Sequence, residues 1–218
     1  MKKSSAPKVS LIITSYHSDL AMRMLTENCI ESLKYGRPDE VILVDDASPI
    51  AYKPPAGILV VERETNGGFP KCANTGFKHA SGDILILSNN DVEYTPGWLE
   101  GILKPLNEGY DISSIRMSDA DGYTTEDKIT EGDWFGSLWA MKRKVYDTIG
   151  GFDESFDKGT FEDKDYHMRA LAAGFKIGKN HGALVEHIGR ATMDKLYPNR
   201  EDFWEGREKY QAKYGRVD

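Results

Sequence analysis

The sequence contains only two cysteines among its 218 residues, Cys29 and Cys72, and they do not form a CxxC pair. We therefore expect neither a disulfide framework nor a cysteine zinc site, and a reducing compartment fits best. Long apolar runs are lacking too, and the run at residues 9–14 is far shorter than the roughly 20 residues that span a membrane. The basic N-terminus leads into a strand-like run and not into a signal-peptide core, which favours a cytoplasmic protein.

An excess of positive charge is also missing, because 28 lysines and arginines face 35 acidic residues and the net charge is −7. This balance argues against nucleic acid as the main partner, since binding a phosphate backbone needs a basic face. It still allows a nucleotide held through a metal ion, which brings its own positive charge. The fingerprint GxGxxG is absent, which weighs against an NAD enzyme.

Short apolar runs alternate with amphipathic segments in the first half of the chain. They predict buried strands and helices in turn, the strands at 9–14, 40–44, 58–61 and 83–88 and the helices at 22–33 and 69–80. This alternation predicts a Rossmann-like, mostly parallel central sheet flanked by helices. The second half is less regular: we expect helices at 96–106, 162–173 and 201–214, a polar acidic loop at 118–128 and a short last strand at 185–187.

Polar residues follow three of the predicted strands, namely Thr14-Ser15-Tyr16, Asp45-Asp46 and Asn89-Asn90-Asp91. Because ligands of open parallel sheets bind beyond the carboxyl ends of the strands, these groups are expected to line one edge. Asn89 and Asp91 present two oxygens that suit a hard cation, although the same residues are also good turn formers. Thr14 and Tyr16 would either contact a nucleobase or cap the sheet edge.

Further polar residues have both a structural and a functional interpretation. Glu162-Asp163 opens a predicted helix, where carboxylates complement the helix dipole, but the pair would also supply a general base. His187 ends a predicted strand and is either a structural histidine or a ligand. The run from Asp119 to Gly122 is interpreted as a solvated acidic loop, because the later ligand spacing of a calcium loop is absent.

Taken in order, several segments resemble the family 2 glycosyltransferases of the GT-A fold. The resemblance covers roughly residues 7–190 and is carried by the ordered set, since each segment alone is weak. The matching segments are 9–16, 41–48, 66–69, 73–76, 80–91, 96–100, 149–154, 161–165 and His187.

The resemblance implies a role for each matching residue. The donor would be bound by Thr14, Tyr16, Asp45, Asp46, Asn66, Lys71, Asn74, Asn89 and Asn90. Asp91 and His187 would hold Mn²⁺ or Mg²⁺, Asp163 would be the catalytic base within the Glu162-Asp163 pair, and Trp134-Phe135-Gly136 would form the acceptor-side wall. One departure is Asn89, which occupies the first aspartate position of the family's DxD motif and lowers the charge of the site.

The resemblance also implies one GT-A domain at 8–190, divided into a nucleotide-binding half, 8–92, and an acceptor half, 93–190. A tail at 1–7 and a helical tail at 191–218 would flank it. The implied activity is metal-dependent, inverting transfer, of hexosyltransferase type, from a nucleotide-diphosphate sugar to a hydroxyl of a glycan, lipid-linked or protein acceptor. A lipid-linked acceptor would be met peripherally at the membrane, and the helix at 201–214 would be open to an oligomer contact.

Two other functions fit a similar outline. A sugar-1-phosphate nucleotidyltransferase is also a metal-dependent α/β nucleotide binder, but the stretch at 14–19 lacks the glycine-rich, basic phosphate loop that it needs. A non-catalytic nucleotide-sugar or glycan-binding GT-A domain would fit Asn89 and the short chain, although Glu162-Asp163 and His187 argue against it. A hydrolase with a carboxylate pair is supported only by generic acids.

Overall fold

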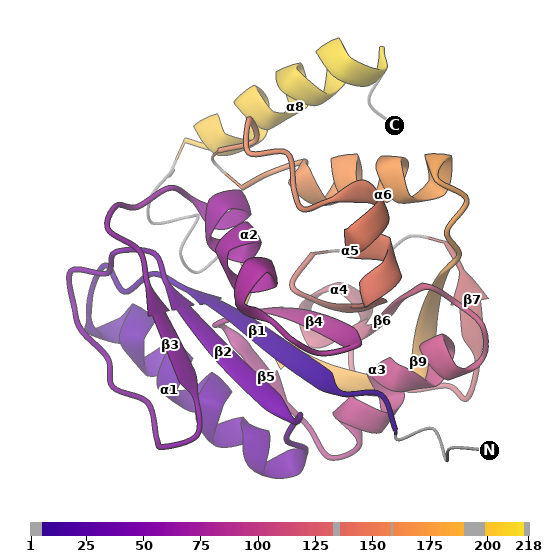
Figure 1. The fold of residues 1–218 in the computed structure, drawn as a ribbon, viewed down its shortest axis with the longest axis horizontal. Coiled ribbons are helices and arrows are strands. Elements are labelled where there is room, and N and C mark those ends of the chain that lie inside the picture. The colour runs from indigo at the N-terminus through magenta and orange to yellow at the C-terminus, as the bar shows by residue number, and fades with distance from the viewer. Residues whose placement is uncertain (1–5, 133–135, 158, 190–198, 216–218) are drawn as a thin grey trace.

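The computed structural model describes residues 6–132, 136–157, 159–189 and 199–215. Within these ranges nine strands form one sheet, with helices on both faces (Figure 1). The strand order is β3-β2-β1-β4-β8-β6-β9-β5, and β7 pairs with β9.

The first half of the chain forms the parallel part of the sheet. Its elements are β1 (Val9–Ser15), α1 (Leu20–Ser32), a 3₁₀ turn η1 (Leu33–Tyr35), β2 (Glu40–Asp45), β3 (Leu59–Glu62), α2 (Phe69–His79) and β4 (Ile84–Asn89). The strands β3, β2, β1 and β4 all run parallel, so the predicted βαβ alternation is confirmed. Asp19 caps α1, because its Oδ1 accepts the backbone N–H of Met22 at 3.0 Å.

The second half adds antiparallel strands. Its elements are β5 (Val92–Tyr94), α3 (Trp98–Asn107), β6 (Ile112–Met117), α4 (Ser118–Asp121), β7 (Ile129–Glu131), β8 (Leu138–Lys142), α5 (Arg143–Ile149), α6 (Glu162–Ala172), β9 (Ile177–His187) and α8 (Glu201–Tyr214). Strand β8 runs antiparallel to both β4 and β6, and β9 is parallel to β6 but antiparallel to β5 and β7. The predicted short strand at 185–187 was wrong in length: it is the end of the 11-residue β9.

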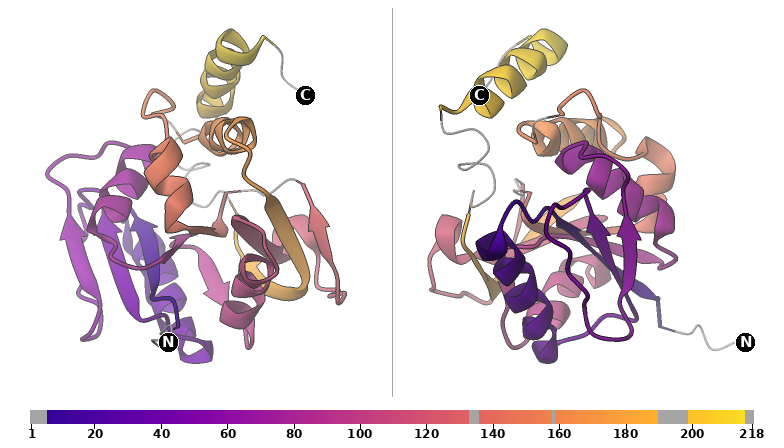
Figure 2. Two further views of the ribbon diagram at one scale, coloured as in Figure 1. Left: turned by 45° about the vertical axis from the view of Figure 1, so that its right-hand side comes forward. Right: turned by 90° about the vertical axis from the view of Figure 1, so that its left-hand side faces the viewer.

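Two apolar clusters fill the space between the sheet and its helices. Leu11 and Ile13 of β1 belong to the cluster under α1 and α3, whereas Ile12 belongs to the cluster under α2, α5 and α6. This alternation follows from the two-residue period of a strand, and Figure 2 shows the helices on the two sides. Burying such a side chain contributes about 1.5–3 kcal/mol.

In the described part of the chain, no helix combines the length and the apolar character that crossing a bilayer requires.

Candidate active site

The carboxyl ends of the first parallel strands lie at one level. Thr14 is the register partner of Val44 on β2 and of Asn89 on β4, and Ser15 is the partner of Asp45. The polar residues after these strands therefore meet at one edge of the sheet, as the sequence predicts. Tyr16 follows β1 at this edge and is half-buried.

Asp45 and Asp46 have different partners at this edge. Asp45 accepts hydrogen bonds on Oδ1 from the backbone N–H of Ser48, at 3.0 Å, and from its hydroxyl. Asp46 is buried; it accepts the N–H groups of Gly67 and Gly68 at 3.1 and 2.9 Å and pairs with Arg63 at 3.1 Å. Burial raises the pKa of Asp46, although these donors and Arg63 oppose the rise. Asp46 thus fastens the segment 63–68, and Asp45 holds the turn that follows β2.

The predicted donor-binding residues of segment 66–74 differ in their surroundings. Asn66 is exposed and Lys71 is half-buried. Asn74 is buried; its Nδ2 donates to the Phe152 carbonyl and to Glu154, at 3.0 and 2.9 Å, and its Oδ1 accepts the Phe152 N–H at 2.8 Å. The Asn74 amide therefore joins α2 to the segment after α5. Its contact with a donor stays a prediction that these bonds do not favour.

A buried polar chain supports the turn at residues 89–91. Asn90 Nδ2 donates to Thr26 Oγ1 at 2.8 Å, and Thr26 Oγ1 contacts His17 Nε2 at 2.9 Å. His17 Nδ1 lies 3.2 Å from the Ile50 carbonyl, so the tautomer that satisfies both contacts carries its proton on Nδ1. Burial lowers the pKa of His17, which keeps the ring neutral. Sequence reasoning missed this link between the 89–91 turn and the loop after β2.

Asp91 and His187 meet because β5 pairs with β9. Val92 is the register partner of His187, so the residue before Val92 lies beside the end of β9. His187 Nε2 is 3.3 Å from Asp91 Oδ1, and neither atom makes a hydrogen bond within the described residues. The other ring nitrogen, Nδ1, is 3.0 Å from Asp119 Oδ2. Burial lowers the pKa of His187, but Asp91 and Asp119 outweigh it and raise the pKa.

The atoms gathered here fit a hard divalent cation. Two neighbouring ligands at about 2.1 Å from one octahedral cation lie about 3 Å apart, close to the 3.3 Å between Nε2 and Oδ1. Asn89 Oδ1 is a further buried oxygen without a hydrogen bond in the described residues. A carboxylate that fixes the second nitrogen of a ligating histidine, as Asp119 does, is a usual outer-shell partner.

The described residues contain no group of three or more histidines, cysteines or acids that could hold a metal. Two protein ligands suffice for a cation that takes its other ligands from water and substrate phosphates.

The polar acidic loop predicted at 118–128 begins with a short helix, and although Asp119 is exposed as predicted, two of its acids have partners elsewhere in the fold. Asp119 contacts His187, as described, and Asp121 accepts the N–H of Met117 at 3.0 Å and pairs with Lys179 at 2.7 Å. Both acids belong to the short helix α4, which packs against β9. No local pattern signals these partners, because β9 lies about 60 residues further along the chain.

Glu162 and Asp163 open α6 in contrasting environments. Glu162 is buried with Oε2 lacking a hydrogen-bond partner among the described residues, and burial together with Asp163 raises its pKa well above the usual value. Burial also raises the pKa of Asp163, but the backbone N–H groups of Lys164, at 2.7 Å, and of Gly136 donate to its carboxylate. The N–H groups thus favour the charged form of Asp163, whereas burial favours the neutral form of Glu162.

The residue before this pair is strained. Phe161 has a φ of 68°, a left-handed conformation that costs a non-glycine residue about 1–3 kcal/mol. Phe161 is the N-cap residue of α6. Its apolar side chain cannot accept a hydrogen bond from the first N–H groups of the helix, and the described residues provide no other side-chain cap.

A two-residue bridge joins the pair to the 89–91 turn. The N–H of Gly136 donates to Asp163, and the carbonyl of the next residue, Ser137, accepts the N–H of Asn89 at 2.8 Å. A Cβ on Gly136 would lie 3.4 Å from Asp163 Oδ2, so the backbone passes close to this carboxylate. Trp134 and Phe135, the other residues of the predicted acceptor wall, lie outside the described residues.

Residues 10–168 match the family model described as Glycosyl transferase family 2. The chain belongs to this family. An uncharacterized glycosyltransferase, YwdF, of Bacillus subtilis is 29% identical over 75% of this chain and 68% of its own length. The undecaprenyl-phosphate 4-deoxy-4-formamido-L-arabinose transferase of Serratia proteamaculans is 28% identical over 53% of this chain, and the match spans only 39% of that longer protein.

Solved structures share the fold of this family member. The mannosyltransferase PcManGT of Pyrobaculum calidifontis, in complex with GDP-Man and Mn²⁺, has a TM-score of 0.69 at 18% identity; the match covers 99% of this chain and 67% of that one. TarS 1-349 of S. aureus, in complex with UDP-GlcNAc, has a TM-score of 0.70 at 20% identity, covering 97% and 67%. Both are GT-A glycosyltransferases, so the predicted GT-A fold is confirmed.

Proposed function

We propose that this family 2 chain transfers a sugar from a nucleoside-diphosphate donor to an acceptor with inversion at the anomeric carbon, assisted by a divalent cation. The observation that carries the proposal is the pairing of Asp91 with His187, whose facing atoms make no hydrogen bond to any described residue. The bridge at Gly136 and Ser137 joins Asp163 to Asn89, the first residue of the turn that carries Asp91.

The donor nucleoside would occupy the edge formed by the first parallel strands. Thr14, Tyr16 and Asp45 follow or end β1 and β2 at the same level, which suits contacts to a base and a ribose. Asn89 ends β4 at the level of Thr14 and Asn90 follows it, while Asn66 lies within the segment 63–68 that Asp46 fastens and Lys71 follows that segment. The buried hydrogen bonds from Asn90 through Thr26 to His17 would hold the turn at 89–91, which would face the diphosphate, in a fixed position relative to the strand ends that would face the base.

Asp91 and His187 would hold Mn²⁺ or Mg²⁺, and Asp119 would keep the His187 ring in the orientation that offers Nε2. When bound, such a cation neutralises charge on the departing diphosphate. Because Asn89 replaces a carboxylate, the protein supplies less negative charge here, which leaves more of the cation's charge for the diphosphate.

Asp163 would be the general base. Two backbone N–H groups orient its carboxylate, and its raised pKa makes it a better proton acceptor than an ordinary aspartate. It takes the proton of the acceptor hydroxyl while that oxygen forms the new bond to the anomeric carbon. The bond from this carbon to the donor phosphate breaks, and its electron pair leaves with the nucleoside diphosphate. One displacement from the opposite face inverts the anomeric configuration.

The acceptor class stays open within this proposal. Relatives whose names contain an undecaprenyl-phosphate or dolichol-phosphate acceptor make a polyprenyl phosphate worth testing beside glycan and protein hydroxyls. With a lipid-linked acceptor the chain would work peripherally at a membrane surface. The chain matches only 39% and 32% of the lengths of these two relatives, so their whole activities need not carry over.

The test is a thermal-shift panel of UDP-, GDP- and dTDP-sugars, with and without Mn²⁺, followed by product analysis with the donor that stabilises. A ligand that binds only the native state raises stability by RT ln(1 + [L]/Kd), so the true donor should stand out in the presence of Mn²⁺. Asp91→Ala should lose this metal-dependent gain. An unchanged gain in that variant would contradict the metal site.

Product analysis separates the proposal from its main rival. Release of a nucleoside diphosphate supports sugar transfer, whereas release of pyrophosphate from a sugar 1-phosphate and a nucleoside triphosphate would support a nucleotidyltransferase. A donor that binds without ever being turned over would support a binding domain.

A further inference from the structure

The C-terminal helix α8 lies over the segment that leads into α6 (Figure 1). Lys209 Nζ is 2.6 Å from both Asp157 Oδ1 and the Ser155 carbonyl, and Lys213 Nζ is 2.7 Å from Asp153 Oδ2. These ion pairs are partly exposed, so each alone is weak. Together they fix α8 along residues 153–157 of its own chain.

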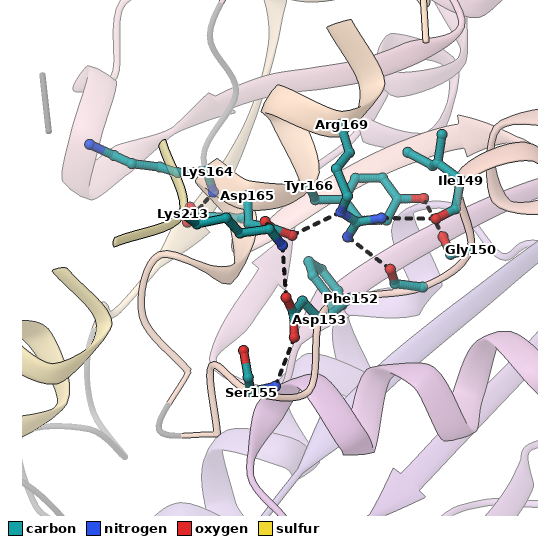
Figure 3. A network of polar contacts seen from close by, with 12 residues as sticks. Ile149, Gly150, Phe152, Asp153, Ser155, Lys164, Asp165, Tyr166, Arg169 and Lys213 are labelled. Carbon is teal, nitrogen blue, oxygen red and sulfur yellow. Dashed lines mark hydrogen bonds and ion pairs between the residues drawn. The ribbon is translucent and has the colours of Figure 1, made fainter. Parts of the chain in front are cut away.

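A fully buried carboxylate in the first turn of α6 depends on α8. Asp165 has no exposed surface, and three groups compensate its charge. Arg169 Nε, from the same helix, lies 2.8 Å from its Oδ2; Lys213 Nζ and the Tyr214 hydroxyl, both from α8, lie 2.6 and 2.8 Å from its Oδ1. Figure 3 shows Asp165 between Arg169 and Lys213. Removing one partner of a buried charge is strongly unfavourable, so Asp165 and α8 are coupled.

Helix α8 also packs on the residues before Glu162. The ring of Phe161 lies 5.4 Å from that of Phe203 and 5.6 Å from that of Tyr210, between ring centroids. A Cβ on Gly206 would lie 2.5 Å from the Thr160 carbonyl oxygen, so α8 touches this backbone directly. The left-handed conformation of Phe161 persists only where neighbouring groups hold it, and α8 supplies two of its aromatic neighbours.

We propose that α8 positions the Glu162-Asp163 pair, with Lys213 and Tyr214 as positioning residues that touch no reacting atom. The helix holds the chain on both sides of the pair, at Thr160-Phe161 before it and at Asp165 after it. No side chain of the described residues caps the start of α6, so these contacts fix the orientation in which Asp163 faces the acceptor. The catalytic consequence rests on the proposed function.

The test compares Lys213→Met with Lys213→Arg and with a matched control, Lys144→Met. Lys144 Nζ also pairs with a buried carboxylate, that of Asp111, at 2.6 Å, but this lysine lies in α5 and the aspartate directly before β6. Lys213→Met should lower kcat on the order of 10- to 100-fold, because a small misplacement of a catalytic group costs this much. KM for the donor and the Mn²⁺-dependent donor affinity should stay unchanged, and Lys213→Arg should restore most of kcat.

The control separates positioning from plain stability. Lys144→Met should lower the midpoint of urea unfolding without changing kcat. If Lys213→Met behaves like Lys144→Met, with a lower midpoint and an unchanged kcat, the proposal is overturned. Should Lys213→Met fail to fold, Tyr214→Phe is the second variant, because it removes only the hydroxyl that donates to Asp165. It should likewise lower kcat and leave donor KM and Mn²⁺-dependent donor affinity unchanged.

Amide hydrogen exchange tests the proposal without any activity. The N–H of Asp165 bonds to the Phe161 carbonyl at 2.9 Å in the first turn of α6. Its exchange should become faster in Lys213→Met and stay at the wild-type rate in Lys144→Met, and equal rates in all three proteins would overturn the coupling. A wild-type chain that turns over no donor would refute the proposed function, while this exchange comparison would still decide whether α8 holds the pair.

Discussion

Glu162 and Asp163 are adjacent acids whose surroundings assign them different protonation states. Glu162 is buried with an oxygen that lacks a partner among the described residues, whereas two backbone N–H groups face Asp163. Hydrogen bonds to the charged form favour it, and burial without them disfavours it. The sequence identifies the pair, but only these contacts distinguish the base from its neighbour.

Asp163→Asn should therefore lose most turnover, about 10²–10⁴-fold, because general-base assistance is worth that much. Donor binding measured by calorimetry with Mn²⁺ should survive. Glu162→Gln mimics the neutral form that burial favours at this position and should retain far more activity. If Glu162→Gln were the more damaging substitution, the two roles would be reversed.

The pH dependence of kcat follows from the same assignment. The base must be ionised, so the rate should fall as the pH drops through the pKa of Asp163. Because burial raises that pKa, the fall should occur at a higher pH than an ordinary aspartate would show. A rate measured against pH with saturating donor checks this, and a rate that stays level down to the usual aspartate range would refute it.

Asp119 is a residue whose partner, His187, the sequence interpretation missed. Its hydrogen bond to His187 Nδ1 predicts that Asp119→Ala weakens Mn²⁺-dependent donor binding by about 10–100-fold, the usual effect of losing an outer-shell partner. The matched control is Asp127→Asn in the same acidic loop, which removes an exposed acid paired only with Lys104 among the described residues. Equal donor affinity in the two variants would exclude an orienting role for Asp119.

Among the elements, strands β5 and β9 do the most to form the site. β5 has three residues and β9 has 11, and their pairing brings Asp91 to His187 across a sequence separation of almost 100 residues. The sequence predicts the end of β9 but not its length, because Gly178, Lys179, Asn180 and His181 interrupt its apolar pattern. It is the pairing of β9 with β6 and β7 that makes these residues extended.

The segment before α2 gives a prediction about backbone geometry. Gly68 has a φ of 80°, and a Cβ there would lie 2.0 Å from the Asp157 carbonyl oxygen, whereas a Cβ on Gly97, with a φ of 82°, would meet no described atom within 4 Å. Gly97→Ala should lower the free energy of unfolding by ~1–2 kcal/mol, the cost of holding alanine in the left-handed conformation. Gly68→Ala should lower the free energy of unfolding by that amount and by about 1–3 kcal/mol more, because the new methyl group would overlap the Asp157 carbonyl oxygen. Urea unfolding of the two variants measures the difference. Equal free energies of unfolding would mean that the backbone at Asp157 moves aside without a measurable loss of stability.

At the scale of the whole molecule, each apolar cluster contains one of the two cysteines. Cys29 lies in the cluster under α1 and Cys72 in the cluster under α2. Both are buried and free, and burial raises the pKa of each thiol, that of Cys29 to about 12. Neither thiol is therefore expected to react with an aromatic disulfide reagent while the chain is folded.

Labelling of the two thiols, followed by mass spectrometry, then reports how the two faces of the sheet open. If the domain unfolds as one unit, Cys29 and Cys72 should be labelled at the same rate across a urea series. Binding of a stabilising donor with Mn²⁺ should slow the labelling of Cys29 and Cys72 by the same factor in the wild-type protein. Rapid labelling of one cysteine alone would show that its face opens independently.

The sequence by itself determined the parallel half of the sheet, the helices that cover it and the chemical character of the edge. Those features depend on local periodicity and on the rule that ligands bind at the carboxyl ends of parallel strands, both of which can be read from neighbouring residues. Family membership likewise followed from short ordered segments such as 80–91 and 161–165.

The tertiary structure alone decided which polar residues cooperate. Asp119 faces His187, Asn74 bonds to Phe152, and Lys213 compensates Asp165 because β9, α5 and α8 return to distant parts of the chain. The physical reason is that a buried polar group needs a partner, but sequence spacing does not encode which one when the partner lies tens of residues away.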